Sequence, residues 1–186
     1  MKRVFAAVLL SFLFYASQAQ AGNVVKWQGK GKVSYTVVHK FHKVKATSNF
    51  LMVKAVVDEN GLQFTARTTV SSFDSGNSNR DSHAMEVVDP AHFPFVTVKG
   101  TEHGFKLPAP GTKTQVTVTA EVDLHGVVAR HPIKLDIETK DATHAKIAFQ
   151  FPESFTAHKM ERPSLMFVAV DDDIEIEGDA NLEVNP

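Results

Sequence analysis

The sequence predicts an all-β protein of about eight or nine antiparallel strands with one short helix. Apolar and polar residues alternate with a period of two along many segments, which is typical of strands with one buried and one wet face. Gly, Asn and Pro separate these segments at short intervals, as turns do. Helical periodicity is confined to residues 80–88. Alternation alone does not distinguish a closed barrel from a packed sandwich, so both architectures stay open at this stage.

The first strands follow from an alternation that starts at residue 33. One face of this segment carries Val33, Tyr35, Val37, His39 and Phe41. Residues 51–57 form a second alternating run. The dipeptide Asn60-Gly61 predicts a two-residue hairpin turn, because both central positions of that turn need positive φ. Residues 62–70 then continue as the returning strand.

The only predicted helix covers residues 80–88. Arg80-Asp81-Ser82-His83 form the turn at its start. Asp89-Pro90 indicates a further short turn, since Asp can cap a helix and Pro suits its first position. Phe93-Pro94-Phe95 then opens a new strand. The helix is therefore an insertion between strands rather than a layer of its own.

The second half of the chain reads as strands only. The clearest alternation covers residues 114–124, and weaker ones follow at 133–137, 147–151 and 174–184. Residues 165–170 are apolar on both faces. We expect their outer side to be covered by another element or by a partner.

The N-terminus predicts export. Lys2-Arg3, an apolar run to residue 15 and the small-residue site Ala19-Gln20-Ala21 make a cleavable signal peptide over residues 1–21. Residues 22–186 are then one domain, long enough for a core without staples. The chain has no Cys, so it uses no disulfides in an oxidising compartment. No second long apolar stretch follows, and we expect no integral membrane segment.

The charges are nearly balanced but unevenly placed. Loss of Lys2 and Arg3 takes the formal net charge from −1 to −3, which disfavours nucleic acid as a partner. Seven Lys and no acidic residue lie between residues 22 and 57, whereas only acidic charges follow Arg162. Pairing of the first and last strands would bring these charges together. The alternative is an anion-binding or membrane-surface patch of lysines.

No sequence motif predicts an enzyme, a cofactor site or a metal site. The nine His include no H-E-x-x-H pair, and His39 and His42 would point to opposite faces of a strand. No Cys is available as a nucleophile. A site assembled only in space, for example from His39, His83 and His125, stays open as an alternative.

Four segments resemble the YceI-like family. They are residues 71–100, Tyr35-Thr36-Val37-Val38-His39, Asp123-Leu124-His125-Gly126-Val127, and Arg162-Pro163-Ser164 followed by Asp171-Asp172-Asp173. Together they span nearly all of the chain after the signal peptide. The resemblance implies a lipocalin-like antiparallel β-barrel, located in the periplasm or secreted. It also implies a non-catalytic carrier that holds a polyisoprenoid or a fatty-acid-type lipid. Several members of the family look dimeric, so the resemblance also allows a homodimer with residues 165–170 at its interface.

Eight residues are candidates for contact with such a ligand. The polar ones are His39, Arg80, His83 and His125, and the aromatic ones are Phe64, Phe93, Phe95 and Phe149. Each has a structural alternative: His39 as a hydrogen-bonded core residue, Arg80 locking its turn with Asp81, His125 anchoring a loop, and the Phe side chains filling a core. If they fill it, the domain is an interaction or stress-response module without a ligand.

Overall fold

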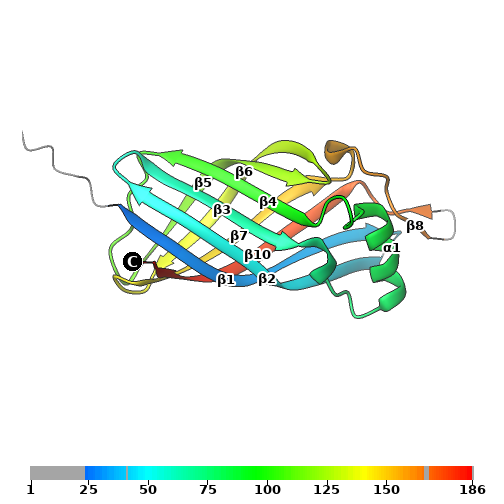
Figure 1. Ribbon diagram of the computed structural model, residues 1–186, viewed down its shortest axis with the longest axis horizontal. Helices are drawn as coiled ribbons and strands as arrows, with labels where there is room; N and C mark the ends of the chain where they lie inside the picture. Colours follow the sequence, from blue (N-terminus) through cyan, green and yellow to red (C-terminus); the bar gives the residue numbers. More distant parts are fainter. Residues whose placement is uncertain (1–23, 41, 166–167, 186) are drawn as a thin grey trace, which may run out of the picture.

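The computed structural model describes residues 24–40, 42–165 and 168–185, and in it eight antiparallel strands close into one barrel (Figure 1). Around the barrel the strands follow the order β1-β10-β7-β6-β5-β4-β3-β2. The all-β barrel prediction is confirmed. The strand bounds are β1 Val25–His39, β2 His42–Asp58, β3 Gly61–Thr69, β4 Phe95–His103, β5 Thr112–Leu124, β6 Val127–Thr139, β7 His144–Ser154 and β10 Asp173–Val184.

The core lines the inside of the barrel through the alternation seen in the sequence. On β5, Val118, Ala120 and Val122 are at most 2% exposed, while Thr117 and Thr119 on the other face are exposed. The same two-residue period runs along the other walls, because successive side chains of a strand point to opposite faces of the sheet. The described residues contain no helix long and apolar enough to cross a membrane.

The barrel closes between its first and last strands, as the charge distribution predicts. β1 pairs with β10 along its length, and Lys32 lies opposite Asp179 with 3.7 Å between Nζ and Oδ2. Lys45 of β2 forms a second ion pair with Glu177 of β10. The basic N-terminal and acidic C-terminal segments are therefore neighbours across this seam.

The first strand begins earlier than the sequence pattern indicates, at Val25 rather than residue 33. Trp27 is 3% exposed, so this Lys-rich stretch contributes to the core. Gly29 and Gly31 interrupt the apolar alternation because β10 passes too close for any side chain. A Cβ at either position would lie about 2 Å from a β10 carbonyl oxygen: 2.0 Å from that of Asn181 for Gly29 and 1.9 Å from that of Asp179 for Gly31.

The β2–β3 turn lies one residue earlier than predicted. Asp58 pairs with Gly61, so the two loop residues are Glu59 and Asn60, and Asn60 does not have positive φ. The Asp58 carboxylate fixes this register by accepting the backbone N–H of Asn60 at 2.8 Å and of Gly61 at 3.2 Å. The Asn-Gly signal thus located the hairpin but not its central pair.

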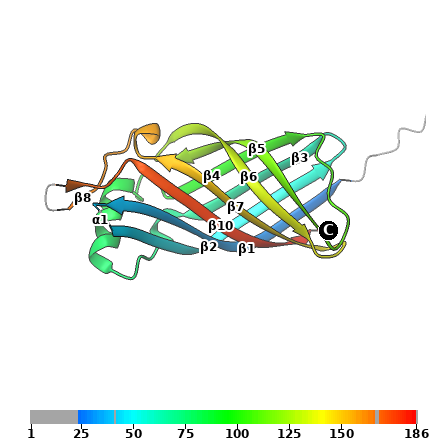
Figure 2. The ribbon, with the colours of Figure 1, turned by 180° about the vertical axis from the view of Figure 1, so that it is seen from behind.

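A single helix, α1 (Ser78–Val88), lies across one end of the barrel (Figures 1 and 2). It begins two residues before the predicted start, because Asn77 is the N-cap and its side chain accepts the N–H of Arg80 at 3.1 Å. Asp89 ends it in the left-handed region at φ +46°, and a turn follows. Two 3-10 turns, η1 (Val70–Ser72) and η2 (Thr156–His158), complete the same end of the fold.

The predicted strand over residues 165–170 is wrong as a single element. The structure has a small hairpin instead, β8 (Ser164–Leu165) paired with β9 (Val168–Ala169), outside the barrel sheet. Residues 166 and 167 lie outside the described residues, as does the predicted signal peptide. Val168 is 36% exposed. A homodimer contact at this hairpin stays a prediction.

Candidate functional site

The barrel contains a cavity of about 260 Å³ at the end that α1 covers. Its wall consists mainly of inward-facing apolar residues of the strands, such as Leu51 and Val122. Four half-buried residues of α1 face it from the end of the barrel: Ala84, Met85, Val87 and Val88. An engineered cavity of about 150 Å³ with comparable lining binds benzene. This interior is therefore large enough to hold an apolar group.

Polar side chains also contribute to the lining of this cavity. His39, Arg80 and His83 all contribute to the lining, so the structure brings three predicted ligand residues together. The Nε2 atom of His39 is buried and has no hydrogen-bond partner in the described residues. This is the opposite of the hydrogen-bonded core histidine considered from sequence. It leaves a polar atom available to a ligand head group.

Arg80 has a structural role as well. Its Nη2 donates to the carbonyl oxygen of Ser75 at 3.0 Å, and Asp81 accepts the backbone N–H of Ser75 at 3.1 Å. The two side chains thus hold the turn before α1 from both sides, as one of the sequence alternatives predicts. His83 lies 3.2 Å from Glu86 through Nδ1 and is exposed on the helix.

Tyr35 is a cavity residue that the sequence analysis placed on the inward face but did not select. Its ring packs on Phe73 with 5.2 Å between centroids. Burial raises the pKa of the Tyr35 phenol, and the Asp81 carboxylate raises it further, against a smaller opposing effect of Arg80. The phenol is therefore a neutral hydroxyl at physiological pH.

A second cavity of about 70 Å³ occupies the other end of the barrel. Phe64, a predicted ligand residue, lines this cavity and not the larger one, and so does Trp27. The two cavities share four lining residues, which we call the waist: Ala66, Val98, Phe149 and Phe151. The two cavities therefore adjoin each other at the waist. The filled core of the interaction-module alternative is not what this barrel has.

Three predicted ligand residues line neither cavity. Phe93 packs outside on the β5–β6 turn, with its ring 4.4 Å from that of His125 and against the bare Cα of Gly126. His125 and Gly126 form that turn with φ +54° and +70°, as expected if His125 anchors the loop. Phe95 is 40% exposed and stacks under the guanidinium of Arg67.

The histidine trio considered for a metal or an enzyme does not form. His39 and His83 share the larger cavity, but His125 belongs to the outer turn described above. In the parts of the chain that the structure describes, the only group of three potential metal ligands consists of other residues. The interior thus offers an apolar chamber with a polar rim.

Comparisons with known proteins agree with this architecture. The structure is similar to a polyisoprenoid-binding domain from Saccharophagus degradans implicated in plant cell wall breakdown, with a TM-score of 0.72, 15% identity, and coverage of 85% of this chain and 98% of that one. It is also similar to BcnA of Burkholderia cenocepacia, with a TM-score of 0.66, 14% identity, and coverage of 81% and 95%. The YceI protein of Campylobacter jejuni follows with a TM-score of 0.54, 14% identity, and coverage of 74% and 85%.

These identities support the fold alone, and no curated protein matches the sequence significantly. The family is shown independently by a sequence model. The model of the YceI-like domain matches residues 15–182, most of the chain. This match agrees with the segments at Tyr35, Arg80, His125 and Arg162 that carry the resemblance. The chain therefore belongs to the YceI-like family.

Proposed function

We propose that this protein is an exported, non-catalytic carrier that holds one long-chain lipid inside the barrel. The lipid is an isoprenoid or a fatty-acid-type chain, its tail lies along the barrel axis, and its polar head lies beside α1. Export to the periplasm follows from the N-terminal pattern of residues 1–21, with extracellular release as a variant of the same route.

The observation that carries this proposal is an apolar interior with two cavities that share part of their lining. Two cavities of about 260 and 70 Å³ meet at four side chains, so one elongated ligand can occupy both with small rotamer changes. Each buried CH₂ contributes about 0.8 kcal/mol. The tail thus gives affinity, while a few polar groups orient the head, as in most small-molecule sites.

The polar rim supports a head group with hydrogen-bonding atoms. His39 offers an unpartnered buried Nε2, Arg80 a guanidinium, and Tyr35 a neutral hydroxyl on the same cavity. A phosphate, a carboxylate, an amide or a quinone oxygen can each accept from such donors. The domain from Saccharophagus degradans is a polyisoprenoid-binding domain, which supports the same class of tail here.

Trp27 provides a direct test, because it is the only Trp of the chain and lines the smaller cavity. Lipid chains brominated near the methyl end should quench its fluorescence at one equivalent. A matched control moves the fluorophore outside: Trp27→Phe with Phe50→Trp, since Phe50 is 67% exposed. Quenching in the wild type but not in the control supports an internal tail. Equal quenching in both, or none in either, refutes it.

A further inference from the structure

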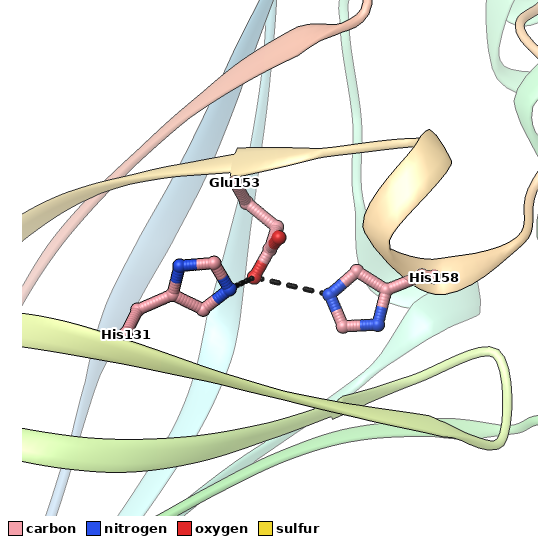
Figure 3. Close-up of side chains that lie close together, drawn as sticks. All are labelled: His131, Glu153 and His158. Carbon is pink, nitrogen blue, oxygen red and sulfur yellow. Dashed lines mark ion pairs between the residues drawn. The ribbon is translucent and has the colours of Figure 1, made fainter.

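Three side chains from three different elements meet at one side of the barrel (Figure 3). They are His131 of β6, Glu153 of β7 and His158 of η2. The Nε2 atom of each histidine lies 3.0 Å from the same Glu153 oxygen, Oε2. The three candidate ligand atoms all lie within 4.8 Å of one another.

The three atoms are buried without hydrogen-bond partners. The Glu153 and His158 side chains are 1% and 0% exposed, and that of His131 is 23% exposed. Neither 3.0 Å contact has hydrogen-bond geometry, so both Nε2 atoms and Oε2 are unsatisfied within the described residues. Burial of a charged oxygen atom that has no hydrogen-bond partner is unfavourable. The cluster is therefore well suited to bind a cation.

The tautomer of His158 also favours a bound cation. Its Nδ1 lies 2.8 Å from the carbonyl oxygen of Val127, which can only accept, so Nδ1 carries the hydrogen. A neutral His158 then turns the Nε2 lone pair toward the Glu153 carboxylate. The other carboxylate oxygen, Oε1, already accepts the N–H of Ser154 at 2.9 Å. Lone pairs thus converge on one point.

We propose that His131, Glu153 and His158 bind one divalent transition-metal ion of the zinc class. Two imidazoles and one carboxylate are a set that such ions favour. With bonds of about 2.0–2.1 Å, a tetrahedral ion separates its ligand atoms by about 3.3 Å, close to the two 3.0 Å contacts. The Val127 carbonyl orients the His158 ring as outer-shell acceptors do in zinc sites.

The ion would link η2 to the barrel wall, and Glu153 also lines the larger cavity. The competing occupant is a proton. Burial lowers the pKa of His158, but the Glu153 carboxylate and the Val127 carbonyl outweigh it and raise the pKa above its usual value. A proton can bridge only one of the two contacts at a time, whereas a metal ion satisfies all three atoms.

The test is a titration of untagged, lipid-free, chelator-treated protein with Zn²⁺ against a chromogenic chelator, followed by Co²⁺ for its visible spectrum. We expect one equivalent to bind, with the intense absorption of tetrahedral cobalt. His131→Gln should weaken binding by at least about 100-fold, and it should fold because His131 is partly exposed. Glu153→Gln should act in the same direction.

The matched control is His144→Gln. His144 also contacts a carboxylate, with 3.0 Å between Nδ1 and Asp141 Oδ1, but this pair is exposed and has two members only. The control should retain the full affinity. Absence of a tight equivalent in the wild type, or equal affinity in wild type and His131→Gln, overturns the proposal. The titration contains no lipid, so its result is independent of the carrier function.

Discussion

Replacement of Phe149 by Ala tests whether the waist limits the length of the bound chain. Phe149 lines both cavities, and its ring fills the space over Gly178, where a Cβ would lie 2.5 Å from the ring. Removal of the ring should join the cavities of about 260 and 70 Å³ permanently. A longer chain can then enter without displacing any side chain.

The magnitude follows from the volume that becomes accessible. The smaller cavity of about 70 Å³ has room for about two groups of the size of water, at about 30 Å³ each. Two further buried CH₂ groups add about 1.6 kcal/mol, which is more than tenfold in Kd. The substitution also has a cost in stability of about 3 kcal/mol, which lowers the Tm by about 6–12 °C.

The assay is competition of saturated fatty amides of increasing length against an apolar fluorescent probe. In the wild type, Kd should fall about fourfold per CH₂ and then level off. Phe149→Ala should level off at least two CH₂ groups later. The matched control, Phe93→Ala, removes a half-buried ring that lines neither cavity, and it should keep the wild-type break. If the Kd of Phe149→Ala levels off at the same chain length as that of the wild type, the waist does not limit the length of the bound chain.

Three further predictions concern the rim, the seam and an ionisable group. His39→Leu should weaken the binding of lipids with a polar head by about tenfold, because the unpartnered Nε2 atom is lost. The affinity for pure hydrocarbons should stay unchanged. An equal loss of affinity for both ligands in isothermal titration calorimetry contradicts a contact with the head group. Lys32→Glu should lower the Tm by about 2–4 °C, because a cross-strand ion pair contributes up to about 1 kcal/mol. Adding Asp179→Lys should restore the Tm, since the pair is then present with its charges exchanged. A double variant whose Tm stays low contradicts a stabilising pair. Burial raises the pKa of Tyr35 in the folded state above that in the unfolded chain, which is about 10. The contribution of Tyr35 to stability is therefore complete below the unfolded-state pKa, and it is lost as the pH rises through the folded-state pKa. A phenolate absorbance titration of residues 22–186, where Tyr35 is the only Tyr, should show a midpoint above that of the urea-unfolded chain; coincident midpoints contradict its burial.

The strands of the barrel were predictable where apolar and polar residues alternate in step with the two faces of the strand. β5 shows this, since every second residue from Val118 is buried. Prediction failed where another constraint replaced the apolar residue. Gly29 and Gly31 carry no side chain because β10 passes too close, so the first strand looked like a polar leader. At the β2–β3 turn, the Asp58 side chain fixed a register that dipeptide statistics do not contain.

The site was predictable only in part, for a physical reason. His39 and Phe149 belong to inward-facing series, and both line the larger cavity as the period of two predicts. Phe93 and Phe95 were selected by residue type, and their positions on the outer side depend on packing against Gly126 and Arg67. The cluster around Glu153 was beyond reach, because its ligands come from three elements and no spacing motif connects them.

The central claim, that the barrel holds an apolar chain, is tested most directly on protein from its own cells. Native mass spectrometry of the purified mature protein, followed by organic extraction, measures the adduct and its class together. The cavities of about 260 and 70 Å³ predict one discrete adduct per chain that extracts as an isoprenoid or a fatty-acid-type lipid. A clean apo mass from native membranes and periplasm alike, with no extractable lipid, would contradict the carrier account.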